Sequence, residues 1–153
     1  MTGVQTCALP IYVDASAILL TTSKRLALAV ASEVERQLRT LSTAAVAAKS
    51  IARNSAIILV RSVEEALEIS NRFAPEHLSI PDASLLPGVL HAGSVFVGPY
   101  SPEAAGDYAS GPNHVLPTSG AARQRGGLSV TDYLKVISVQ ELTQPALDRK
   151  SVV

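Results

Sequence analysis

The sequence has a single cysteine, Cys7, and no excess of charge. One thiol can form neither an internal disulfide framework nor a metal site built from a cysteine cluster, so a reducing, cytoplasmic setting is expected. The 13 Lys and Arg residues balance 13 Asp and Glu residues and are scattered along the chain. Since proteins that bind nucleic acid usually gather basic residues into a patch, no nucleic-acid partner is expected.

The sequence also lacks an apolar run long enough to cross a bilayer. The apolar runs, such as the one at residues 15–20, fall far short of the ~20 residues of a membrane-spanning helix. No membrane partner is therefore expected. With 153 residues, of which 47% are hydrophobic, the chain has the size and composition of one globular domain.

The two ends of the chain differ from the sequence between them. Residues 8–11 can be encoded GCT CTT CCG ATC, whose reverse complement, GAT CGG AAG AGC, encodes residues 148–151. Such an inverted pair resembles an adapter ligated to both ends of a DNA insert for sequencing. We therefore predict that residues 1–11 and 148–153 are an artefact and that the natural gene continues beyond both ends.

Between these ends, apolar runs typical of strands alternate with helical patterns. The helical patterns have apolar residues at spacings of three and four, or are rich in alanine. Ser62 and Glu65 have the spacing of a capping box, and Pro75 marks the end of the helix that follows. Strands are expected at residues 17–20, 55–60, 78–80 and 94–97, and helices at residues 26–41, 44–53, 63–73 and, as a short helix or turn, 83–91.

This alternation predicts an α/β layered domain with a mostly parallel sheet over residues 12–97. The composition of the chain changes after residue 97. Residues 98–127 are rich in Gly and Pro and lack an apolar period, which indicates a long loop that carries function. We expect one or two helical turns at residues 129–135 and a last strand at residues 136–142.

The chain has few histidines to serve in catalysis or metal binding: His77, His91 and His114. His77 follows Glu76 directly after the helix-ending proline, where side chains can point from a sheet edge towards a ligand. Alternatively, Glu76 is merely solvated and His77 is a hydrogen-bonded residue of the surface or core. His91 is more simply explained as a capping residue near a helix end.

Asp107 and His114 lie in the predicted loop, among small residues and glycines. A carboxylate on such a loop can ligate a metal, and the histidine could do the same or bind substrate. An Asx turn with a structural histidine explains the pair equally well, because zinc generally needs three or four protein ligands. The Gly-x-Gly-x-x-Gly, Walker and Gly-x-Ser-x-Gly motifs are absent.

Three longer segments carry a family resemblance. Together they resemble the C-terminal half of the histidinol dehydrogenases, and the resemblance runs over residues 13–147. The middle segment is the longest and most specific. The segments are RFAPEHL at residues 72–78, GSVFVGPYSPEAAGDYASGPNHVLPT at residues 93–118 and GLSVTDYLKVISV at residues 127–139.

The resemblance implies a function and a role for each candidate residue. The family oxidises L-histidinol through histidinal to L-histidine with NAD and a bound Zn²⁺, as a homodimer. His77 matches its general base, which also contacts substrate, and Glu76 matches the acidic partner that activates water. Asp107 matches a zinc-ligating carboxylate that also contacts substrate, and His114 a substrate-pocket residue. Residues 12–97 would form a partial Rossmann-like unit of the aldehyde-dehydrogenase-like fold, and residues 98–147 the catalytic loop and return segment.

The chain departs from the family at the other zinc ligands. These are a Gln and a His in a QAEH segment before residue 17 and a His near the C-terminus, and none occurs here. The family's NAD contacts also lie upstream, so the chain alone is expected to bind zinc weakly and to be inactive. The alternative is a non-catalytic small α/β binding or interaction protein derived from that fold, in which Glu76 and Asp107 have structural roles.

Overall fold

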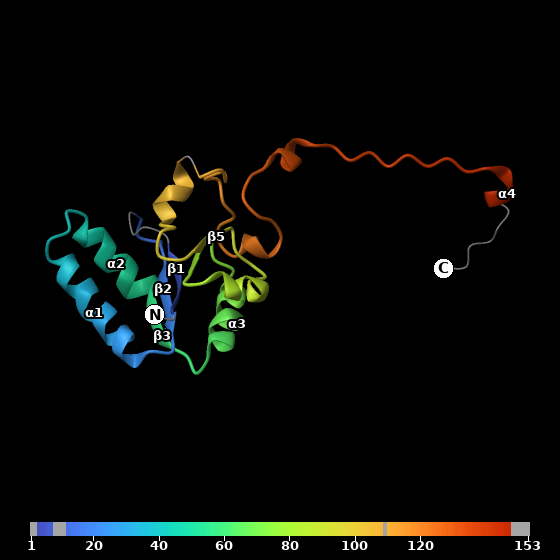
Figure 1. The fold of residues 1–153 in the computed structure, drawn as a ribbon. Helices are drawn as coiled ribbons and strands as arrows, with labels where there is room; N and C mark the ends of the chain where they lie inside the picture. The colour runs from blue at the N-terminus through green and yellow to red at the C-terminus, as the bar shows by residue number, and fades with distance from the viewer. Residues whose placement is uncertain (1–2, 8–11, 109, 148–153) are drawn as a thin grey trace.

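The computed structural model describes residues 3–7, 12–108 and 110–147. They form an α/β structure around a five-stranded sheet with the strand order β3-β2-β1-β4-β5. Helices α1 (Lys24–Leu38) and α2 (Ala44–Asn54) lie on one side of the sheet and α3 (Val63–Phe73) on the other, as Figure 1 shows. The strands are β1 (Gly3–Cys7), β2 (Ala17–Thr21), β3 (Ala56–Leu59), β4 (His77–Ile80) and β5 (Ser94–Val97). The predicted layered α/β class is confirmed.

Parallel pairs flank a central antiparallel strand. β2 pairs in parallel with β3, and β4 pairs in parallel with β5. β1 lies between the two pairs and is antiparallel to both β2 and β4. The predicted parallel pairing therefore holds on either side of β1, which belongs to the segment left out of the fold prediction. The assignment of residues 1–11 to an adapter stays a prediction.

Most of the hydrophobic core lies between one face of the sheet and α3. Leu20, Leu78 and Ile80 are buried there and form one cluster with Ala66 of α3. Alternate residues of a strand share a face, and residues three and four apart share a helix face, so these patterns bring the apolar side chains together. Full burial of a leucine contributes about 1.5–3 kcal/mol. No described helix is long and apolar enough to span a membrane.

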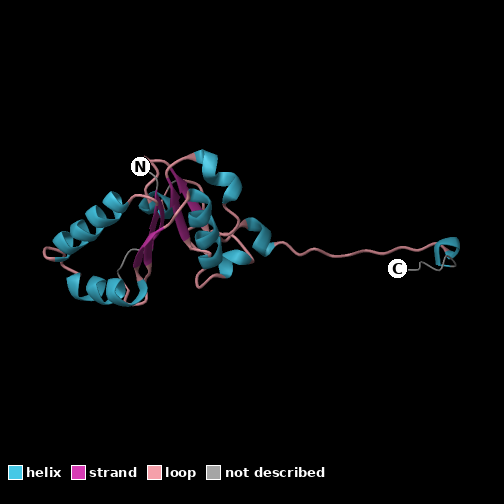
Figure 2. Ribbon diagram, turned by 90° about the horizontal axis from the view of Figure 1, so that it is seen from below, coloured by secondary structure: helices cyan, strands magenta, loops and turns pink. Residues whose placement is uncertain are grey.

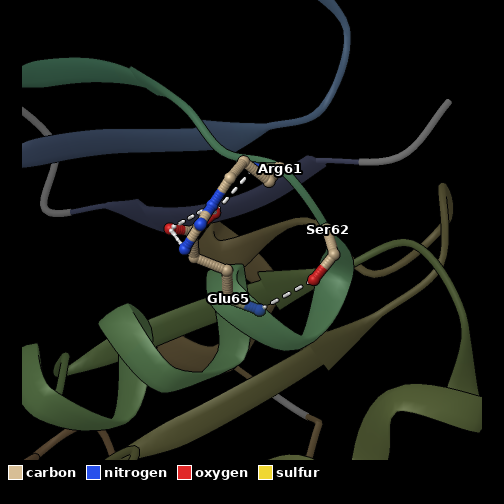
Figure 3. A network of polar contacts seen from close by, with 3 residues as sticks. All are labelled: Arg61, Ser62 and Glu65. Carbon is tan, nitrogen blue, oxygen red and sulfur yellow. Dashed lines mark hydrogen bonds and ion pairs between the residues drawn. The ribbon is translucent and has the colours of Figure 1, made fainter.

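The predicted capping box of α3 forms only in part. The Ser62 hydroxyl accepts the Glu65 backbone N–H at 3.2 Å (Figure 3). The Glu65 carboxylate accepts the backbone N–H of Arg61 at 2.7 Å, one residue before the position that a capping box uses. The Arg61 guanidinium also donates to this carboxylate and lowers the pKa of Glu65. The carboxylate therefore reaches further back than predicted, because it meets a charged partner there.

The helices match their predicted ranges closely, except at one end. The first was expected to reach residue 41 but ends at Leu38, after which the N–H groups of Thr40 and Leu41 bond to the Gln37 carbonyl as a turn. The second ends one residue later than expected. The third stops at Phe73, where Ala74 adopts a left-handed conformation with φ 54° before Pro75.

The strand expected at residues 136–142 does not form. These residues run away from the sheet as an extended segment, as Figures 1 and 2 show. Val136 is 92% exposed and Val139 is 88% exposed. A strand needs a neighbour for its backbone N–H and C=O groups, and no described residue supplies one here. The sequence pattern was right about extended geometry but wrong about pairing.

The remaining C-terminal predictions are confirmed with added detail. The helical turn expected at residues 129–135 is a 3₁₀ helix at Val130–Tyr133, with a capping box between Ser129 and Asp132. The predicted loop at residues 98–127 contains two further 3₁₀ helices, η2 (Glu103–Asp107) and η3 (Ala121–Arg123). Another, at Ala83–Gly88, forms where a short helix or turn was expected. A four-residue helix, α4 (Gln144–Leu147), follows the extended segment.

One side chain of α3 holds the loop that leads to β5. The Asn71 side-chain amide donates to the Gly88 carbonyl at 2.8 Å. Its carbonyl oxygen accepts the backbone N–H groups of Leu90 at 2.8 Å and His91 at 3.2 Å. A single amide thus satisfies three backbone groups that no helix or strand pairs, and it fixes the approach to β5.

We expect Asn71→Ala to lower the free energy of unfolding by about 2 kcal/mol, because it removes these hydrogen bonds from a partly buried loop. Urea denaturation followed by circular dichroism measures the change. Asn71→Asp is the matched comparison, because it keeps the accepting oxygen and replaces the donor to Gly88 with a charged oxygen. An alanine variant as stable as the unsubstituted chain would contradict this role.

Candidate functional site

The predicted pair Glu76 and His77 lines a cavity of about 620 Å³. Its walls come from three segments that are far apart in the sequence: the approach to β2, the link between α3 and β4, and the loop before η3. The lining residues are Tyr12, Asp14, Ala15, Ser16, Arg72, Phe73, Ala74, Pro75, Glu76, His77, Thr118, Ser119, Gly120 and Arg123. The structure therefore places both residues at a cavity.

The cavity lies at the amino ends of β2 and β4. Both strands are antiparallel to β1, so they run in the same direction, and the cavity-lining residues precede each of them. Open α/β sheets usually bind ligands at the carboxyl ends of their strands. Glu76 and His77 thus lie at the edge formed by the amino ends of β2 and β4, which is opposite to the edge that such sheets usually use.

The local sequence around Glu76 fixes its backbone. The left-handed Ala74 and the following Pro75 turn the chain from α3 into β4, and both residues are buried. The Pro75 carbonyl accepts the Gly93 N–H at 2.9 Å, and the Glu76 carbonyl accepts the Ser94 N–H at 2.9 Å. The start of β5 therefore holds the backbone of the candidate pair.

Gly93 allows this close approach. A Cβ atom added to it would lie 2.6 Å from the Glu76 carbonyl oxygen and 3.0 Å from Cδ of Pro117. We expect Gly93→Ala to lower the free energy of unfolding by about 1–3 kcal/mol, since the backbone must shift to admit the methyl group. Gly126→Ala is the matched control, because nothing lies within 4 Å of its added Cβ. Equal stabilities of the two variants in urea would contradict the close packing.

His77 has a buried ring nitrogen without a hydrogen-bond partner among the described residues. The buried atom is Nδ1. The imidazole stacks on Phe96, with ring centroids 5.8 Å apart and an interplanar angle of 24°. An unpaired buried nitrogen is costly and usually calls for a partner. The ring is thus held by an aromatic contact, while its buried Nδ1 has no hydrogen-bond partner among the described residues.

The structure places Asp107 and His114 differently. Asp107 is the last residue of η2, which lies against Phe96 through Gly106, so its backbone is near the element that carries the His77 contact. The Asp107 side chain lies outside the described part of the structure. His114 is exposed in the following loop and is not among the described residues that line the cavity. The described contacts therefore do not bring His114 to the candidate pair.

The described residues do not fit a complete zinc site. No group of three or more His, Cys, Asp or Glu side chains among them could hold a metal ion. Zinc generally needs three or four protein ligands. The described turn after β2 does not fit the pyrophosphate of NAD either, because it has Thr22 and Ser23 where a pyrophosphate-binding turn has glycines.

Sequence reasoning missed the arginines of the cavity. The Arg123 guanidinium donates to the carbonyls of Gly120, at 3.1 Å, and of Arg72 at the end of α3. This contact ties η3 to the segment that leads to Glu76. The two partners are 51 residues apart, and no local pattern signals such a contact. The approach to β2, including Tyr12 and Asp14, was missed for the same reason.

Comparison with known proteins gives a consistent picture. The family model described as histidinol dehydrogenase matches residues 12–152. A histidinol dehydrogenase of Bacillus cereus is 54% identical over 136 residues, which cover 87% of this chain and 32% of that protein. One from Bacteroides fragilis is 49% identical over 133 residues, which cover 85% of this chain and 31% of that protein.

A solved structure is similar as well. The crystal structure of histidinol dehydrogenase from Elizabethkingia anophelis superimposes with a TM-score of 0.78 at 36% identity. The similarity covers 90% of this chain and 32% of that one. The chain therefore spans about a third of the length of the relatives that it matches.

Proposed function

Because the chain belongs to the histidinol dehydrogenase family, we propose that it supplies the acid–base part of an enzyme that oxidises L-histidinol through histidinal to L-histidine. The observation that carries the proposal is the position of Glu76 and His77, side by side at one cavity. A family match over residues 12–152 includes every segment that lines it. The proposed product places the enzyme in histidine biosynthesis.

His77 acts as the general base in this proposal. Oxidation of an alcohol to an aldehyde removes a hydride from carbon and a proton from oxygen. The imidazole ring of His77 accepts that proton, because His77 lines the cavity. The stacked Phe96 keeps the ring in place. NAD supplies the hydride acceptor when bound.

Glu76 acts in the second oxidation. The aldehyde must first add water, and the water must lose a proton as its oxygen attacks the carbonyl carbon. Glu76 is next in sequence to His77 and lines the same cavity, which supports its carboxylate as the group that takes this proton. The Ser94 N–H donates to the Glu76 carbonyl, and this hydrogen bond fixes the backbone position from which the Glu76 side chain extends.

The proposal extends to zinc and to a homodimer. Asp107 would supply one zinc ligand, and the other ligands would come from parts of the enzyme outside the described residues. An exposed apolar surface after residue 129 supports a second chain, because soluble monomers rarely leave such a stretch in water. Its residues are Val130, Tyr133, Leu134, Val136, Ile137, Val139 and Leu142.

A chimera tests the proposal. In the Bacillus cereus relative, the third that matches this chain is replaced by residues 12–147 of this chain. This hybrid protein is the chimera. We expect it to form NADH and L-histidine from L-histidinol, as followed by absorbance and chromatography, whereas the 153-residue chain alone should form neither. The unmodified relative is the positive control.

Two outcomes would contradict the proposal. A chimera that folds as the relative does but fails to oxidise histidinol would favour a non-catalytic α/β binding protein. Activity of the chain alone would contradict the expectation that zinc and NAD sites need further protein. Circular dichroism and gel filtration of the chimera separate loss of function from loss of folding.

A further inference from the structure

Phe96 contacts two parts of the proposed active site. It belongs to β5 and is 8% exposed. Its ring stacks on the imidazole of His77, with ring centroids 5.8 Å apart. The rim of the same ring meets η2, where a Cβ atom added to Gly106 would lie 2.9 Å from Cζ and 3.1 Å from Cε1. One aromatic ring thus contacts both the base and the turn that carries Asp107.

The register of the sheet explains this arrangement. β4 and β5 pair in parallel, with His77 opposite Ser94 and Ser79 opposite Phe96. Alternate residues of a strand share a face, so His77, Ser79 and Phe96 lie on the same face of the sheet. This is the face that η2 covers.

A second contact holds η2 against the same face. The Ser79 hydroxyl donates to the Glu103 carboxylate at 2.9 Å. Glu103 is the first residue of η2, and Gly106 is the fourth. The short helix is therefore fixed at both ends, by a hydrogen bond at its start and by the ring of Phe96 near its end.

Gly106 packs so closely against Phe96 that a side chain there would collide with the ring. Real Cβ atoms essentially never come within 3.0 Å of another group, so only glycine fits at this position without movement. A shift of the Phe96 ring would alter its stacking on His77. Any side chain at position 106 must therefore move η2, or move the ring and with it the imidazole.

We propose that Phe96 is a positioning residue, which with Gly106 sets the placement of the Asp107 turn relative to the His77 ring. The inference rests on the proposed function and goes further, since Phe96 and Gly106 are not among the described residues that line the cavity. A phenylalanine that only filled the core would affect stability alone. A positioning residue affects turnover by the folded enzyme.

The test uses the chimera with Gly106→Ala and its matched control Gly126→Ala, which adds the same methyl group in open space. We expect Gly106→Ala to lower kcat per zinc-loaded enzyme about tenfold, because small misplacements at a reacting centre are costly. The Gly126→Ala control should keep kcat within about twofold of the kcat of the unsubstituted chimera. Zinc content of each protein is measured by mass spectrometry, so that turnover and metal retention are read separately.

A double variant shows whether the effect passes through the ring. In a Phe96→Leu background, Gly106→Ala should lower kcat by about threefold at most, because contacting residues are not additive. Full additivity of the two losses would overturn the proposal. If Gly106→Ala fails to fold, Phe96→Leu alone carries the test, with an expected loss in kcat of about tenfold.

The results also separate this inference from the function it rests on. An inactive but folded chimera without these substitutions would overturn both. An active chimera in which Gly106→Ala and Phe96→Leu each keep kcat within about twofold would overturn the positioning role alone. An active chimera with the expected losses and the compensation supports both.

Discussion

His77→Ala in the chimera should reduce histidinol oxidation by a factor of about 10²–10⁴, the usual contribution of a general base. The variant loses the imidazole that accepts the hydroxyl proton, while Glu76 and the cavity walls remain. Zinc content should not change, because His77 is assigned as a base and not as a ligand. Steady-state NADH formation and metal analysis of the same preparation measure both quantities.

A second histidine of the chain provides the control for this prediction. His91 lies outside the cavity-lining residues, and the bonds to Asn71 there come from its backbone N–H, which alanine keeps. His91→Ala should therefore leave turnover near that of the unsubstituted chimera. Loss of zinc from the His77 variant equal to its loss of activity would contradict the assignment of His77 as a base.

The sequence predicted well those features whose causes are local. The start of α3 follows from the Ser62 hydroxyl and the Glu65 amide, and its end follows from Pro75, all within a few residues. The Glu76 and His77 pair was found because it adjoins that end. The turn at Val130–Tyr133 likewise depends on Ser129, which caps it directly.

Features that depend on distant partners could not be predicted in the same way. Residues 136–142 were expected to form a strand, yet pairing requires a neighbouring backbone that no described residue provides. The contact from Arg123 to the end of α3 joins residues 51 apart. Stacking of Phe96 on His77 depends on the register between β4 and β5, which only the folded sheet fixes.

The proposed role of Asp107 has the next largest expected effect. Asp107→Asn in the chimera should weaken zinc retention by about 100-fold or more, because even partners in the outer shell of a metal site contribute 10–100-fold. The substitution removes a negative charge and keeps the shape of the side chain. The two contacts that hold η2, from Ser79 to Glu103 and from Phe96 to Gly106, are left intact.

Dialysis against a graded series of chelator concentrations, with zinc measured at each step, gives the change in affinity for Asp107→Asn. Asp82→Asn is the matched control, because its side chain caps the 3₁₀ helix at Ala83–Gly88 by accepting the Ser84 N–H at 2.7 Å, and an amide oxygen can do the same. Zinc retention equal in the two variants would remove Asp107 from the ligand set. Since His77→Ala should lose turnover and keep zinc, whereas Asp107→Asn should lose zinc first, the two variants together distinguish a base on β4 from a ligand on η2.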